Sequence, residues 1–135
     1  MIFYMYISGD FNGGFNGGLR AGLEFMIEPN EKYYVTRSTA VKVTCKARGA
    51  VHISFKCANS WIKQEHSVTR ESFDQITNKN IVETSITVTK DEVDAYYGSD
   101  GYWCECYASD QEPGSAGGYT VKSEKRGLIE AACKY

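Results

Sequence analysis

Two cysteines one residue apart constrain the fold of this chain more than any other feature. The stretch YWCECYA (102–108) is rich in aromatic residues and predicts a β-strand. Side chains of a strand alternate between its two faces, so Cys104 and Cys106 point to the same side. Next-but-one residues of a strand lie about 7 Å apart, at the upper limit for a disulfide. Each of the two cysteines therefore requires a partner elsewhere.

Two further cysteines lie in stretches with the same alternation. AVKVTCKA (40–47) places its valines and Cys45 on one face and its lysines and threonine on the other. VHISFKC (51–57) places its apolar residues on the face that carries Cys57. Because a bond between the adjacent pair is excluded, two of the three possible connectivities remain, and each of them gives two disulfides.

Further strand signals are separated by turns along the rest of the chain. IVETSITVT (81–89) alternates between apolar and polar residues, whereas 62–80 is polar and predicts short strands and loops. The other expected elements are a first, edge-like strand over 25–36 interrupted by Pro29, a helical turn over 90–98, a loop over 110–118 and a final strand over 119–131. Short strands at this spacing predict an antiparallel sandwich.

The cysteine positions narrow the sandwich to one type. A bond from Cys45, on the second strand, to the penultimate strand is the hallmark of the immunoglobulin sandwich, where it joins the two sheets. Cys57 stands about where such a domain usually has its core tryptophan. The second bond then links neighbouring strands of one sheet. We therefore expect an all-β, immunoglobulin-like antiparallel β-sandwich with two disulfides.

The domain organisation follows from composition. Residues 1–22 contain a tandem FNGG and are expected to form a disordered, Gly-rich N-terminal segment. The immunoglobulin-like domain is expected over 23–131, with 132–135 as a tail that carries Cys133. No apolar run reaches the length of a membrane span, and the apolar start lacks the basic residues of a signal peptide. If the domain is extracellular, we expect the chain to be a fragment.

Three other classes of function have little support. The formal charge of −2 favours neither nucleic acid nor an anionic membrane. The only histidines, His52 and His66, are not part of a nucleophile–base pattern, so we expect no enzyme and no cofactor. A thiolate metal site in a cytosolic domain is the weakest alternative, because zinc sites of this kind use C-x₂₋₄-C spacings.

The two cysteine-containing blocks resemble a known family. CKARGAVHISFKCANSW (45–61) and VETSITVTKDEVDAYYGSDGYWCEC (82–106) are similar to the first immunoglobulin domain of the repulsive, uncoordinated-five class of netrin receptors. The resemblance covers about residues 25 to 131 and implies the pairs Cys45–Cys106 and Cys57–Cys104. It departs where Ser109 replaces the usual tryptophan, and in the longer loop that follows.

The resemblance also implies a function. It indicates an extracellular, ligand-binding domain of an axon-guidance receptor at the outer side of the plasma membrane. The partners it implies are netrin-like secreted proteins, leucine-rich-repeat adhesion proteins, and glypican or heparan sulphate. The alternative is a generic immunoglobulin-superfamily module for adhesion or immune recognition.

Two groups of residues are candidates for binding. Trp103 points away from the cysteines, so we expect it on the outer face of its sheet, where exposed aromatic residues are good interface anchors. The alternative is that the 62–80 segment or a further domain covers it. The candidates for protein binding are Trp103, Tyr107, Lys56, His52 and Trp61; the candidates for glycosaminoglycan binding are Lys42, Lys46 and Arg48. A row of basic residues is more often the solvated face of a strand.

Overall fold

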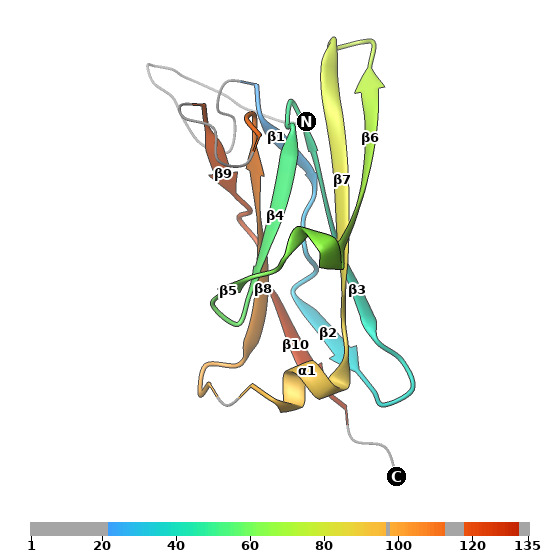
Figure 1. Ribbon diagram of the computed structural model, residues 1–135, viewed down its shortest axis with the longest axis vertical. Helices are drawn as coiled ribbons and strands as arrows, with labels where there is room; N and C mark the ends of the chain where they lie inside the picture. The colour runs from blue at the N-terminus through green and yellow to red at the C-terminus, as the bar shows by residue number, and fades with distance from the viewer. Residues whose placement is uncertain (1–21, 97, 113–117, 133–135) are drawn as a thin grey trace.

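The computed structural model describes residues 22–96, 98–112 and 118–132, and within them two β-sheets pack face to face (Figure 1). One sheet has the order β1-β3-β7-β6, and the other has the order β2-β10-β8-β4-β5 with β9 also paired to β8. The strands are Glu24–Ile27 (β1), Lys32–Val35 (β2), Val41–Arg48 (β3), His52–Cys57 (β4), Ser60–Trp61 (β5), Ser67–Asp74 (β6), Lys79–Val88 (β7), Tyr102–Ser109 (β8), Thr120–Lys122 (β9) and Gly127–Ala131 (β10). The expected all-β sandwich is confirmed.

The predicted alternation of the long strands fills the space between the sheets. Phe55 from β4, Val43 from β3 and Val82 from β7 are almost completely buried, as are the four strand cysteines. The opposite faces of the same strands carry lysine, serine, threonine and glutamate side chains. The buried layer therefore follows from the period-two pattern of the sequence.

The first strand is divided between the two sheets. β1 pairs with β3 in one sheet, and after the buried Pro29 the chain crosses over, so that β2 pairs with β10 in the other. The pairing of β2 with β10 is parallel, and the other strand pairs of the described residues are antiparallel, as predicted. Proline removes a backbone donor and fixes φ, which ends the first ladder and permits the crossover.

The prediction for residues 62–80 was partly wrong. A short 3₁₀ helix, Gln64–His66, is followed by the eight-residue strand β6, which pairs with β7 along its whole length. β6 is an edge strand and nearly all its residues are exposed, Val68 and Phe73 included. Since neither of its faces is buried, its sequence has no apolar alternation that would predict the strand.

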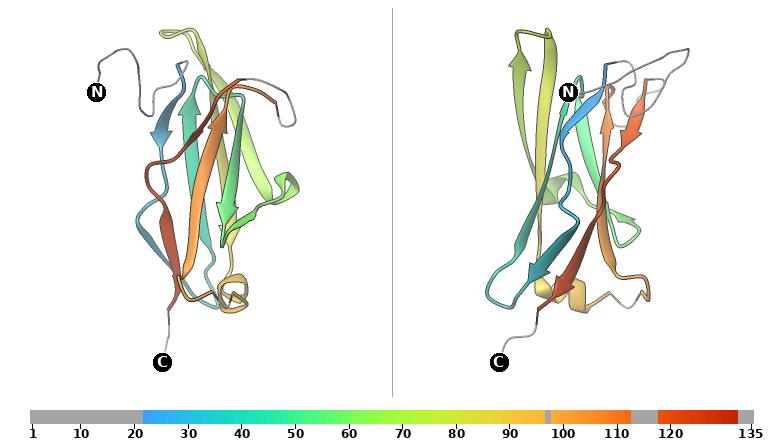
Figure 2. Two further views of the ribbon diagram at one scale, coloured as in Figure 1. Left: turned by 90° about the vertical axis from the view of Figure 1, so that its left-hand side faces the viewer. Right: turned by 180° about the vertical axis from the view of Figure 1, so that it is seen from behind.

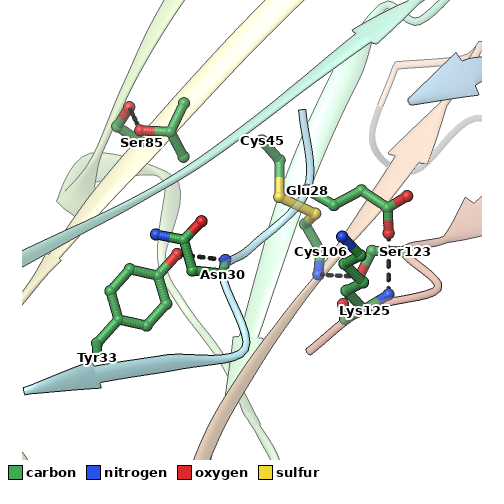
Figure 3. Close-up of a disulfide and its surroundings, with 9 residues drawn as sticks. Glu28, Asn30, Tyr33, Cys45, Ser85, Cys106, Ser123 and Lys125 are labelled. Carbon is green, nitrogen blue, oxygen red and sulfur yellow. Dashed lines mark hydrogen bonds between the residues drawn. A yellow bond between two sulfur atoms is a disulfide. The ribbon is translucent and has the colours of Figure 1, made fainter. Parts of the chain in front are cut away.

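The final strand is also divided, into β9 and β10, with residues 123–126 between them. Figure 3 shows the reason: the Ser123 hydroxyl accepts a hydrogen bond from the Cys106 amide at 3.2 Å and donates one to the Lys125 carbonyl at 2.7 Å. The Lys125 amide in turn donates to Glu28 at 2.9 Å. These bonds bend the chain beside the disulfide, and both halves still pair with β8.

The expected helical turn is the short helix Lys90–Asp94 (α1), between β7 and β8. Its first residue is preceded by Thr89, whose hydroxyl accepts from the Glu92 amide while the Glu92 carboxylate accepts from the Thr89 amide. This reciprocal capping satisfies two backbone donors at the helix start. The predictions for residues 1–22 and 132–135 concern mainly positions outside the described ranges, as does most of the 110–118 loop.

Candidate binding face

The four strand cysteines form the two disulfides that the family resemblance implies. Cys45–Cys106 joins the two sheets across the core, with 6.7 Å between the Cα atoms. Cys57–Cys104 joins neighbouring strands of one sheet, with 4.1 Å between the Cα atoms. Because all four sulfur atoms are in disulfides, these cysteines do not provide the thiolate ligands that the metal-site alternative requires.

The outer face of the sheet formed by β4, β5 and β8 carries most of the predicted protein-binding residues, and the left panel of Figure 2 shows this sheet in front. Trp61 is 57% exposed, and its ring lies 4.9 Å from that of Tyr107. The Lys56 ammonium lies 5.4 Å from the centre of the Trp61 ring. These three residues form one amphipathic cluster on β4, β5 and β8, which we call the aromatic face. The exposed Trp61 ring therefore lies on the surface of the domain.

Trp103 lies on the same side of the sheet but is not open to solvent on both faces of its ring. The Arg126 guanidinium covers the ring, with 4.0 Å between its central carbon and the ring centre. The indole nitrogen donates to the Asp100 carbonyl. The covering group thus comes from the segment between β9 and β10, and the side chain offered to a partner at this position is Arg126.

Glu105 lies between Trp103 and Tyr107 on the outer face of β8 and is held by its neighbours. Its carboxylate accepts a hydrogen bond from the Tyr107 hydroxyl at 2.9 Å and lies 3.8 Å from the Lys122 ammonium. Burial, and next this bond to Glu105, raises the pKa of Tyr107 above its ordinary value. The network fixes the orientation of the tyrosine ring on which Trp61 packs.

His52 lies at the far end of β4 from this cluster. Its Nε2 atom is 2.7 Å from the Ser54 hydroxyl and 3.3 Å from the Gln64 side-chain nitrogen. Burial lowers the pKa of His52, because removal from water disfavours the charged imidazolium. His52 thus lies at the margin of the aromatic face. Because its pKa is lowered, the ring adds no positive charge to that face at neutral pH.

The three glycosaminoglycan candidates share the outer face of β3 but differ in environment. The Arg48 guanidinium lies 2.7 Å from Glu24 and 3.2 Å from Asp74, and its side chain is only 25% exposed. Two carboxylates thus neutralise this charge. Within the described residues Lys42 and Lys46 form no ion pair, so only these two of the three present uncompensated charge.

The sequence analysis missed Arg126 and Lys122 as members of the site. Both come from the segment 119–131, which was expected to be one regular strand, and the bend at Ser123 places Arg126 over Trp103. Basic residues next to Trp103 in the sequence would have indicated a contact with its ring. Lys122 and Arg126 instead lie about twenty residues further along the chain.

Two negative observations concern the described ranges only. Residues 22–96, 98–112 and 118–132 contain no cluster of three His, Cys, Asp or Glu side chains that could hold a metal ion. The helices in this part of the chain are too short to cross a membrane.

The fold places the domain in a broad class. The crystal structure of Rst D1-D2 matches 82% of this chain and 48% of its own, with a TM-score of 0.50 and 9% sequence identity. At this identity the likeness concerns the fold alone. The two sheets, the disulfide between them and this likeness define an immunoglobulin-like domain.

Comparison of the sequence with known proteins identifies the family within this class. Residues 21–125 match the family described as the netrin receptor unc-5 N-terminal domain, and the chain belongs to that family. Netrin receptor UNC5D of Rattus norvegicus and of Mus musculus are each 38% identical to it over 82 residues, which is 61% of this chain. The chain spans 9% of the length of each of these receptors. The resemblance found in the cysteine blocks is therefore confirmed.

Proposed function

We propose that this domain is an extracellular ligand-binding module of an axon-guidance receptor and that it binds a netrin-like protein through the aromatic face. The supporting observation is the cluster of Trp61, Tyr107 and Lys56, in which a mostly exposed tryptophan is held by a neighbouring ring and a cation. Pre-oriented aromatic side chains lose little conformational entropy on binding, and such residues dominate the energetics of protein interfaces.

The test is a binding measurement with purified netrin and the full chain immobilised on a surface. Trp61→Ala is expected to weaken binding by about tenfold or more, as truncation of a central aromatic anchor usually does. Phe73→Ala is the matched control, because Phe73 is 53% exposed, much like Trp61 at 57%, but lies on β6 in the other sheet. Equal affinities of the two variants would place the netrin site elsewhere.

If netrin does not bind the folded domain at all, the partner is of another kind. Leucine-rich-repeat adhesion proteins are the next candidates by family resemblance, and the same two variants test them. Binding of neither class would favour the generic adhesion or immune-recognition module.

We further propose that Lys42 and Lys46 contribute to heparan sulphate or glypican binding. They share the outer face of β3 and form no ion pair with a carboxylate among the described residues. Heparin retention is expected to fall for Lys42→Gln and Lys46→Gln, because each removes one positive charge from an anion-binding row. Unchanged retention would mean that these lysines are merely the solvated face of the strand.

A further inference from the structure

We infer that a small depression beside the aromatic face binds an acidic side chain of the protein partner. The depression lies at the start of β8, next to the β4–β5 hairpin, and its walls include Lys56, Arg126, Trp103, Asp100 and Glu105. This inference rests on the proposed protein-binding function and adds the chemistry of one contact.

Two cations line the depression, and each is supported by a tryptophan. The central carbon of the Arg126 guanidinium lies 4.0 Å from the centre of the Trp103 ring, and the Lys56 ammonium lies 5.4 Å from the centre of the Trp61 ring. Neither Lys56 nor Arg126 forms an ion pair with a carboxylate in the part of the chain that the structure describes. A guanidinium stacked on a ring keeps the N–H groups of its edge available, and these groups match the two oxygens of a carboxylate.

The two acidic residues of the depression limit which anion it suits. Glu105 is bound by Tyr107 and faces Lys122, and Asp100 accepts a hydrogen bond from the Tyr96 hydroxyl at 3.0 Å. Neither carboxylate forms an ion pair with Lys56 or Arg126 among the described residues, so both cations keep their hydrogen-bond donors available. A glycan with many sulphate groups would be repelled by the two carboxylates, whereas one carboxylate can contact the arginine and lysine. The depression therefore favours an acidic side chain of a protein over a sulphated glycan.

The backbone beneath the depression is already fixed. The Ala58 amide donates to the Trp103 carbonyl at 2.9 Å, and the Cys57–Cys104 disulfide lies directly below on the buried side of the sheet. The groups that would contact the carboxylate extend from a cross-linked pair of strands, so little ordering is needed when a partner binds.

The experiment is a titration of the nitrogen-15-labelled full chain with a short, otherwise uncharged peptide that carries one glutamate, followed by NMR. The chain has two tryptophans, so the indole N–H signals of Trp61 and Trp103 report separately on the aromatic face and the depression. The peptide is expected to shift the Trp103 signal and the Arg126 side-chain signal. In Arg126→Gln the affinity should fall by about tenfold, the loss expected for a charge-assisted hydrogen bond.

Lys42→Gln is the matched control, because it removes the same charge from the opposite sheet. The inference is overturned if both variants lose affinity equally, or if a heparin-derived disaccharide shifts the Trp103 signal more than the peptide does. Arg126→Lys keeps the positive charge but loses the planar guanidinium, so this variant should bind the peptide with intermediate affinity. Well-dispersed spectra show that each variant is folded. If Trp61→Ala abolishes netrin binding while Arg126→Gln does not alter it, the proposed function stands and this inference fails.

Discussion

Cys57 lies directly opposite Cys104 on the neighbouring strand, and the residues next to them belong to the outer face of the sheet that contains β4 and β8. Lys56 is paired with Glu105 in the same register, and the Ala58 amide bonds to the Trp103 carbonyl. Since side chains alternate along a strand, a disulfide on the buried side places its neighbours on the exposed side. The second disulfide of this domain thus supports both the core and the candidate binding face.

Removal of this disulfide should affect stability and binding together. The variant Cys57→Ala/Cys104→Ala keeps Cys45–Cys106, so we expect it to remain folded but to lose about 2–4 kcal/mol of the free energy of unfolding. Netrin binding should weaken as well, because the aromatic face loses its cross-link. Urea denaturation and surface binding measure the two effects. Unchanged binding in a destabilised variant would reduce the disulfide to a purely stabilising role.

We expect Arg48 to contribute to the stability of the domain and not to heparin binding. Arg48→Met leaves the carboxylates of Glu24 and Asp74 without their partner, and we expect a loss of about 1–3 kcal/mol in the free energy of unfolding. Arg70→Met is the control: Arg70 also pairs with a glutamate, Glu83, at 2.8 Å but is 78% exposed, so less than about 1 kcal/mol is expected. Equal losses, or reduced heparin retention for Arg48→Met alone, would contradict this account.

The cap of α1 can be tested at one position. Thr89→Ala removes the hydroxyl that accepts from the Glu92 amide and should cost about 1 kcal/mol. Thr89→Ser keeps the hydroxyl and should behave like the original chain. Thermal denaturation measures the cost, and amide hydrogen exchange over residues 90–94 shows whether the loss is local. No difference between the two variants would mean that the cap has no effect on stability.

The stability of the domain should fall in mild acid because of His52. Burial lowers its pKa in the folded state below the ordinary value of 6.5, so the unfolded chain binds the proton more readily. Stability contributed by the neutral ring is therefore present above about pH 6.5 and is lost as the pH falls below it. His52→Gln should show a weaker decline over this range. His66→Gln, at a 67% exposed side chain, is the control and should retain the original pH dependence.

The sequence predicted the strands that have one buried face. Buried residues recur at every second position along all of β4 and β8 and along most of β3 and β7, so the alternation identifies both the strand and the core. Short strands were expected over 62–80, but the single eight-residue strand β6 was not predicted, because an edge strand with two exposed faces needs no alternation. The division of 119–131 into two strands was not predicted either. The bend depends on the hydrogen bonds of Ser123, one of which joins it to Cys106 on β8, far away in the sequence.

The candidate site was predicted only in part, because some of its contacts join segments that are distant in the sequence. Strand parity placed Trp103, Tyr107 and Lys56 on one face, and the structure brings Trp61 beside them. The partners of Trp103 and Arg48 are set by tertiary contacts: Arg126 covers the first, and two carboxylates neutralise the second. Such contacts between distant segments leave no periodic signal in one sequence.

The most direct test of the proposed binding face is hydroxyl-radical footprinting of the full chain with and without netrin. The method reports the solvent exposure of individual side chains, and Trp61 and Phe73 are about equally exposed on opposite sheets. We predict that netrin protects Trp61 and Tyr107 from oxidation and leaves Phe73 unchanged. Protection of Phe73 with Trp61 still oxidised would show that the partner binds the other sheet and would contradict the account.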